Sequence, residues 1–211
     1  MNSRPAIPGA RYGRGFVGSA LLLALATMPL TAAADPPPTR NLEWGLPQLM
    51  AQMHAVRSAS ARFIERKFDQ LLNQPLQSSG TLIFIAPDTL QKETLAPAPS
   101  RLTVVADRLT IVQPDGRTRT LSLSEVPELG ALVASIRATL AGDAATLDRY
   151  YALTLSGSAG DWSLVLQPRD ARLRDLLTMI RIRGEGSLIS RIETVEHDGD
   201  RTEMTITPEP G

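Results

Sequence analysis

Hydrophobic positions recur with two different periods along the chain. The first run has the three- and four-residue spacing of an amphipathic helix: Leu46, Leu49, Met50, Met53 and Val56. Pro47 suits the first turn of that helix. From residue 59 onward the period is two, and short turn sequences such as "PDGR" separate the runs. The alternation predicts about eleven strands, over residues 59–70, 78–86, 89–95, 102–106, 108–113, 117–123, 150–156, 162–167, 176–183, 188–197 and 201–207.

A second helical segment interrupts the strands between residues 124 and 142. Its apolar stripe consists of Val126, Leu129, Leu132, Val133, Ile136 and Leu140. Ser124 is placed to cap the N-terminus of this helix, and Gly142 is placed to end it. The sequence "AATLDRY" adds a short helical turn. Because the strands have no strand–helix–strand rhythm, we expect a mainly β (α+β) fold with one strongly curved antiparallel sheet whose concave side the helices cover.

One predicted strand is apolar beyond simple alternation. In "GTLIFIAPDTL", residues 80–90, Leu82, Ile83, Phe84 and Ile85 follow one another directly, although one face of an antiparallel strand usually meets water. Two interpretations stay open. The second face of this strand packs in an ordinary core, or it lines a cavity for acyl chains beneath helices that do not fill the concave side.

Composition narrows the classes of function. A chain of 211 residues with 43% hydrophobic and 21% charged residues is typical of one folded globular domain. Its 22 basic and 22 acidic residues give a formal net charge of zero. That balance argues against nucleic acid, or an anionic membrane surface, as the main partner.

The N-terminus has the pattern of a secretory signal peptide. Arg4, Arg11 and Arg14 accompany the apolar stretch "GFVGSALLLALATMPL", and three alanines at residues 32–34 offer a cleavage site. We expect residues 1–34 to be a cleaved signal peptide that directs the chain to the periplasm. Residues 35–43 would then form an extended Pro-rich tether, and residues 44–211 a single domain. A membrane anchor is the alternative, but the apolar run is short for a span.

Catalytic chemistry has little support in the sequence. The chain has no Cys, which excludes a thiolate metal site and a lipidated N-terminal Cys. No G-x-S-x-G elbow or phosphate-binding glycine loop occurs. The turn "HDGD" could offer His197, Asp198 and Asp200 to a cation, but it is also an ordinary hairpin turn, which we favour. We therefore expect no enzymatic activity, no catalytic or metal-binding residue and no cofactor. A hydrolase with an unrecognised pair of carboxylates is the alternative.

In chain order, the predicted strands resemble those of the periplasmic outer-membrane lipoprotein carrier family, the LolA-like proteins. "SARFIERKF" is similar to that family's early strand, with Phe63 at the matching position. "GTLIFIAPDTL" is similar to its Gly-x-Leu strand before a Pro turn, and "LTVVADRLTIVQP" to the hairpin that follows. "SRIETVEHDGDRTEMTIT" resembles the closing hairpin. The resemblance covers nearly all of the mature chain.

This resemblance implies an incomplete, half-open β-barrel of eleven antiparallel strands, covered by lid helices, whose apolar interior holds acyl chains. The expected lipid-binding cavity consists of Phe63, Leu82, Phe84, Val104 and Ile111. The expected lid consists of Leu129, Leu132, Val133 and Ile136. Each of these side chains could equally be an ordinary core residue, because such carriers use one apolar surface for both purposes.

The function implied is that of a soluble, monomeric periplasmic carrier or chaperone without catalytic activity. It would shield the acyl chains of lipoproteins or lipid-like cargo on the way to the outer membrane, between an inner-membrane donor and an outer-membrane acceptor. Some positions depart from the family: Ala86 stands where an Arg commonly holds the lid closed, and Glu65 replaces the usual Gln. Arg108 replaces a turn Gly, and Thr110 a common aromatic. The chain thus resembles a divergent member, and an envelope sensor or adaptor that binds a protein partner through the same sheet is the alternative.

Overall fold

The computed structural model describes residues 44–209. The signal peptide predicted at residues 1–34 and the tether predicted at residues 35–43 therefore lie outside the described residues. Within them the strands are β1 (Ser58–Phe68), β2 (Leu76–Ile85), β3 (Thr89–Ala96), β4 (Ser100–Val105), β5 (Arg108–Val112), β6 (Thr118–Ser122), β7 (Tyr151–Ser158), β8 (Asp161–Pro168), β9 (Leu177–Glu185), β10 (Leu188–Glu196) and β11 (Arg201–Pro208). The helices are α1 (Leu46–His54), α2 (Pro127–Ala141), α3 (Ala144–Tyr150) and α4 (Ala171–Leu176), with a 3₁₀ turn η1 (Leu123–Glu125) before α2.

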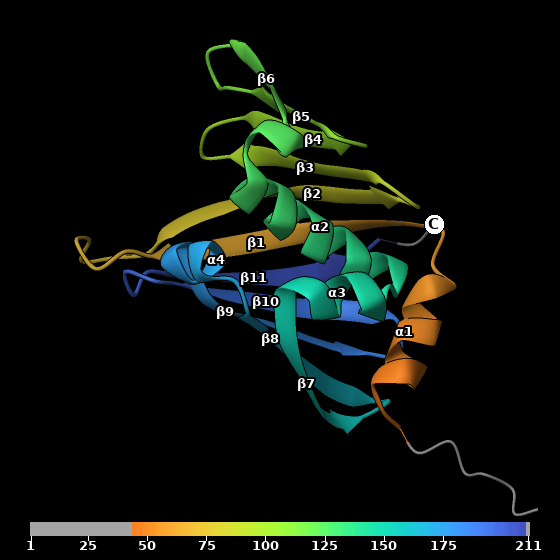
Figure 1. The fold of residues 1–211 in the computed structure, drawn as a ribbon. Coiled ribbons are helices and arrows are strands. Elements are labelled where there is room, and N and C mark those ends of the chain that lie inside the picture. Colours follow the sequence, from red (N-terminus) through yellow and green to blue (C-terminus); the bar gives the residue numbers. More distant parts are fainter. Residues whose placement is uncertain (1–43, 210–211) are drawn as a thin grey trace, which may run out of the picture. The chain divides into compact units, whose positions relative to one another are not determined.

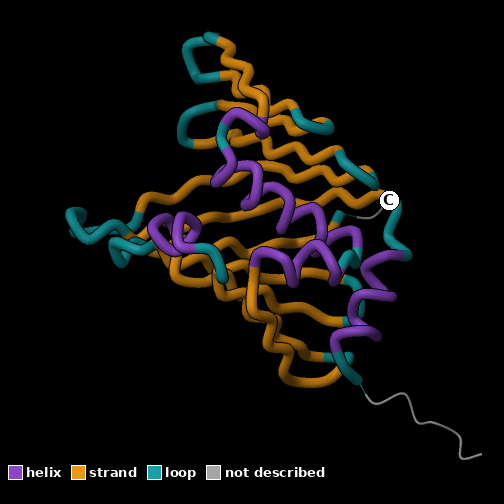
Figure 2. The backbone as a smooth tube through the Cα atoms, in the orientation of Figure 1, coloured by secondary structure: helices purple, strands orange, loops and turns teal. Residues whose placement is uncertain are grey.

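The strands form one antiparallel sheet in the order β6-β5-β4-β3-β2-β1-β11-β10-β9-β8-β7 (Figure 1). Strand β1 pairs with β2 on one side and with β11 on the other, so it joins two hairpin ladders that are far apart in sequence. Strands β6 and β7 are the two edges, and the sheet does not close (Figure 2). The prediction of an incompletely closed antiparallel sheet of eleven strands is confirmed, and every predicted strand overlaps an observed one.

The helices lie against one face of the sheet, which we call the covered face; the other is the open face (Figure 1). Phe84, Leu90 and Val104 are partners across β2, β3 and β4 and lie on the covered face, where Leu90 and Val104 join a cluster with Val133 of α2. The side chains of Ile83 and Ile85 lie on the open face, 36% and 50% exposed. The second face of this apolar strand therefore meets water, and neither predicted alternative, core or cavity, is correct for it.

Two apolar clusters occupy the covered face. The first cluster packs α1, α3 and α4 against β7–β10, and its buried members include Leu49, Leu147, Trp162, Leu164 and Leu173. The second cluster is smaller and lies near the other edge, where buried Val104, Leu109, Leu123 and Val133 meet. Helix α2 contributes to both clusters.

Helix α2 is held closely at its C-terminus. Gly142, with φ of 68°, forms the predicted C-cap, and a Cβ at this position would lie 2.0 Å from the Met50 carbonyl oxygen. Glycine is therefore required both for the left-handed backbone and for the close approach of α1. At the other end the predicted cap is wrong: the N-cap is Val126 and has no side-chain hydrogen bond, whereas Ser124 lies within η1.

Two local features were not predicted from the sequence. Helix α4 is a short turn capped by Asp170, whose carboxylate accepts from the backbone N–H groups of Arg172 and Leu173. Strand β10 contains a bulge between Ile189 and Arg191 in its pairing with β9. The extra residue, Ser190, allows Ile189 to lie on the covered face and Arg191 on the open face, although residues two apart in a regular strand share a face.

Candidate functional site

A narrow apolar groove lies between α2 and strands β8–β10 on the covered face. It is lined by Ser135, Ile136, Thr139 and Leu140 of α2, and by Leu166, Ile180, Ile182, Ile189 and Ile192 of the strands. Its volume is about 60 Å³, and the side chain of Ile136 is 40% exposed. An engineered cavity that holds one benzene molecule measures about 150 Å³, so the groove would enclose an acyl chain only if α2 moved away from the sheet.

The wall of the groove follows from alternation in one strand. In β9, Ile180 and Ile182 are buried on the covered face, whereas Arg181 and Arg183 point to the open face. The pleat of a β-strand imposes this division because its side-chain period is two. The sequence analysis did not single out these isoleucines; the strict Ile–Arg alternation was the signal that could have identified them.

The predicted cavity residues all belong to the covered face but do not line the groove. Phe63, Phe84 and Val104 are buried, and Leu82 and Ile111 are half-buried. Val104 and Ile111 lie in or against the second cluster. The role of all five residues in binding lipid stays a prediction.

The predicted lid residues are divided among three environments. Leu129 and Val133 pack in the second cluster, Leu132 packs against the first cluster, and Ile136 lines the groove. The most deeply buried side of α2 instead carries the small residues Ala138, Ser135 and Thr139. Small side chains let the neighbouring elements approach α2 closely.

The polar groups on this buried side of α2 find local partners. Ser135 Oγ lies 2.7 Å from the carbonyl oxygen of Leu132 and 3.2 Å from the hydroxyl oxygen of Tyr151. Thr139 Oγ1 donates to the carbonyl oxygen of Ser135 at 2.9 Å. Burial raises the pKa of Tyr151, so this hydroxyl stays neutral and serves as a structural hydrogen-bonding group.

An ion pair crosses the covered face between the two apolar clusters. Lys92 Nζ lies 2.6 Å from Glu65 Oε2, and the hydroxyl of Ser78 donates to Glu65 Oε1 at 3.2 Å. The ammonium group also lies 5.0 Å from the centre of the Phe63 ring, within the range of a cation–π contact. Because Glu65 and Lys92 lie on strands β1 and β3, the apolar surface is interrupted at the middle of the sheet rather than continuous from edge to edge.

Helix α2 and the segment that precedes it are both attached to the turn between β4 and β5. Arg137 Nη2 donates to the carbonyl oxygen of Ala106. The neighbouring carboxylate of Asp107 accepts from the hydroxyl of Ser122, and from the backbone N–H and hydroxyl of Ser124 at 3.0 and 3.1 Å. These hydrogen bonds, led by that of Ser122, lower the pKa of Asp107. The attachment fixes η1 and therefore the segment that leads into α2.

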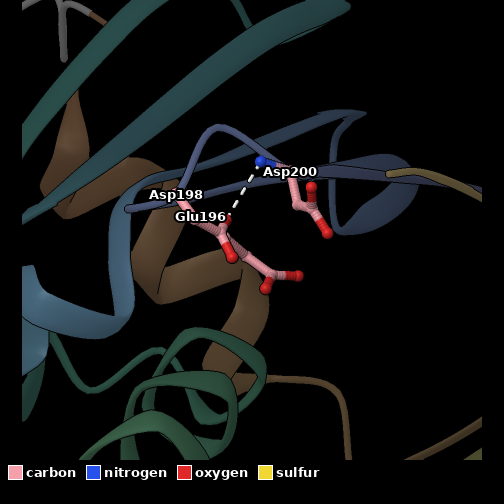
Figure 3. A group of neighbouring side chains, drawn as sticks. All are labelled: Glu196, Asp198 and Asp200. Atoms are coloured by element: carbon pink, nitrogen blue, oxygen red, sulfur yellow. Dashed lines mark hydrogen bonds between the residues drawn. The ribbon is translucent and has the colours of Figure 1, made fainter. Parts of the chain in front are cut away.

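Three acidic side chains lie together at the turn between β10 and β11 (Figure 3). They are Glu196, Asp198 and Asp200, whose carboxylate oxygens lie within 4.8 Å of one another. His197, one of the residues named with this turn in the sequence analysis, is not among them. Lys67 Nζ lies 3.5 Å from Glu196 and 3.4 Å from Asp200, and the Glu196 charge is the main reason that the pKa of Lys67 is raised. The chain's own ammonium group thus offsets part of the negative charge.

The fold and the groove together define a half-open β-barrel with a helix-covered interior. The family model described as "Outer membrane lipoprotein carrier protein LolA-like" matches residues 34–207. The chain belongs to this family, as its sequence motifs indicated. No curated protein sequence matches the chain. Among the described residues, none of the helices is long and apolar enough to cross a membrane.

Several solved structures are similar to the chain at low sequence identity. A LolA superfamily protein from Nitrosomonas europaea is 11% identical, with a TM-score of 0.42 over 75% of this chain and 90% of that chain. A chain of the Pseudomonas aeruginosa MucA/MucB complex is 14% identical, with a TM-score of 0.37 over 79% of this chain and 57% of its own. A chain of the Clostridioides difficile CwlD–GerS complex is 10% identical, with a TM-score of 0.36 over 71% of this chain and 82% of its own.

Proposed function

We propose that the protein is a periplasmic carrier that shields the acyl chains of a lipoprotein or lipid-like cargo on its covered face. The observation that carries the proposal is the apolar groove beside α2, in which the side chain of Ile136 stays 40% exposed. Membership in a family described by lipoprotein carriage supports a binding role of this kind. Each methylene group removed from water contributes about 0.8 kcal/mol, so binding needs no covalent step.

Loading in this proposal requires displacement of α2. The groove volume of about 60 Å³ is far smaller than an acyl chain. The N-terminal half of α2 covers the smaller cluster, whereas its C-terminal end is locked against α1 through Gly142. The helix would therefore swing about its C-terminal end, and cargo would enter beneath Ile136.

The route to the periplasm is part of the same proposal. Residues 1–34 would serve as a cleaved signal peptide and residues 35–43 as a tether to the domain. The carrier would act as a monomer without catalysis, taking cargo from an inner-membrane donor and passing it to an outer-membrane acceptor.

The proposal is tested by placing a charge in the groove. In Ile136→Asp the carboxylate would have to be desolvated against an acyl chain, so we expect the affinity for a fluorescent fatty-acyl probe to fall at least tenfold. Ile85→Asp is the matched control, because Ile85 has a similar exposure but lies on the open face. The affinity of this variant for the acyl probe should equal that of the wild type. Circular dichroism establishes that both variants are folded.

Native mass spectrometry of the protein purified from periplasm without detergent gives an independent measurement. Bound acylated species would support the carrier and reveal the class of cargo. An unliganded mass, together with failure to take up the acyl probe, would contradict it. The small groove volume would then favour the second candidate, an envelope sensor or adaptor whose sheet binds a protein partner.

A further inference from the structure

The net charge of zero conceals an uneven distribution of charge over the sheet. The alternation that places isoleucines in the groove places Arg181 and Arg183 on the open face of β9. Arg191 of β10 and Arg201 of β11 lie on the same face. Arg66 of β1 extends this basic region, because it is the register partner of Glu203 on β11.

Two acids in this region are already neutralised. Glu193 Oε2 lies 2.7 Å from Arg181 Nη1, and its Oε1 lies 3.9 Å from Arg201. Glu203 Oε1 lies 3.1 Å from Arg201 Nη1. Within residues 44–209, neither Arg183 nor Arg191 forms an ion pair with a carboxylate. Two positive charges therefore remain without a counter-charge from the described chain.

These two arginines lie directly opposite each other. Arg183 and Arg191 are register partners across β9 and β10, and like charges in such a pair are destabilising. Their partners on the outer sides of the same row are Ser163 of β8 and Thr205 of β11. The row thus presents two guanidinium groups flanked by two hydroxyl groups. A depression of about 50 Å³ lies here, lined by Arg181, Arg183, Arg191, Glu193 and Glu203.

We propose that this row binds the phosphate groups of anionic lipid headgroups at a membrane surface. Guanidinium groups match phosphate oxygens with paired hydrogen bonds, and the two flanking hydroxyls can donate as well. Exposed apolar side chains lie nearby on the same face: Ile64, next to Thr205 in the row, is 49% exposed, and Ile83 of the adjacent strand is 36% exposed. A surface that joins unpaired cations to exposed isoleucines complements the boundary between headgroups and acyl chains.

The test compares two double variants in co-sedimentation with lipid vesicles at low salt. Wild type should bind phosphatidylglycerol vesicles and not phosphatidylcholine vesicles. Arg183→Gln/Arg191→Gln should lower the partition coefficient at least about tenfold, given the attraction of each basic residue to an anionic surface. Arg108→Gln/Arg119→Gln is the matched control, because it removes the same charge from two exposed arginines on β5 and β6, at the edge of the sheet far from β9 and β10. Its partition coefficient should change less than threefold.

Each other outcome overturns the proposal. An equal fall in the partition coefficient of the two double variants would mean that only the net charge of the protein determines vesicle binding. Binding of inorganic phosphate, followed by NMR and dependent on Arg183, without binding to vesicles would assign the row to a free anion. Binding of polyglutamate but not of vesicles would assign it to an acidic protein segment. Because none of these readouts measures acyl uptake, their failure would leave the proposed carrier function untouched.

Discussion

The two halves of the covered face are packed very differently, although they belong to one sheet. Strands β7–β10 carry the larger first cluster, in which α1, α3 and α4 pack on the sheet and bury Trp162, Tyr151 and several leucines. The second cluster, between strands β4 and β5 and the helical segments η1 and α2, has only four buried residues. The difference teaches that the first half is the structural scaffold, whereas the second half can open at a smaller cost in buried apolar surface.

The largest expected effect comes from matched leucine truncations in the two halves. Leu164 and Leu109 are both buried strand residues on the covered face, one in each cluster. Truncation of a buried leucine typically costs about 2–5 kcal/mol, depending on how far the site can collapse. We expect Leu164→Ala to lie at the upper end and Leu109→Ala at the lower end, measured by urea unfolding. Equal losses, or a larger loss at Leu109, would contradict the division into scaffold and opening half.

A smaller effect is expected from the attachment of α2. Asp107→Asn removes the carboxylate that holds Ser122 and Ser124, so the start of α2 should loosen and an acyl probe should load several-fold faster at neutral pH. Because the folded-state pKa of Asp107 lies below the ordinary 3.8, the attachment is fully present above that pH and is lost as the pH falls through the lower folded value. Stopped-flow loading should therefore show wild type and variant converging in that acidic range. A variant that loads at the wild-type rate at pH 7 would show that this contact does not limit opening.

The smallest effect is expected at the scaffold side, where α3 begins. Asp143 caps α3, with Oδ1 accepting from the Thr146 N–H at 3.0 Å and Oδ2 from its hydroxyl at 2.6 Å. Asp143→Ala should cost about 1 kcal/mol of unfolding free energy and leave acyl loading unchanged. The hydrogen bonds to Thr146 lower the pKa of Asp143, so the difference between wild type and variant should vanish as the carboxyl protonates below its ordinary value. A changed loading rate would mean that α3 belongs to the moving part.

The number of strands and the positions of α1, α2 and α3 could be predicted, because they depend on local hydrophobic spacing and on residues such as Gly142. The prediction that Ser124 caps α2 was wrong, because its hydroxyl donates instead to Asp107, seventeen positions away in the sequence. The cavity residues were predicted from their apolar side chains alone. An apolar side chain suits an ordinary core position as well as a cavity wall, so this criterion could not distinguish the two. The groove and the arginine row depend on which residues face each other across β9 and β10, and a bulge shifts that register. Sequence alone gives no measure of where such a bulge falls.

That bulge ties the two faces of the sheet to a single inserted residue. Because Ser190 is the extra position, Ile189 reaches the groove and Arg191 reaches the open face in the same stretch of chain. Deleting Ser190 would place Ile189 and Arg191 next to each other in a regular strand, opposite their present partners Gly184 and Arg183. Neighbouring residues of a strand face opposite sides, so the isoleucine would stay on the covered face and the arginine on the open face. For protein engineering, Ser190 is therefore the position where β10 can lose a residue without exchanging its interior and exterior side chains, whereas a residue removed elsewhere in the strand would exchange the sidedness of the residues that follow.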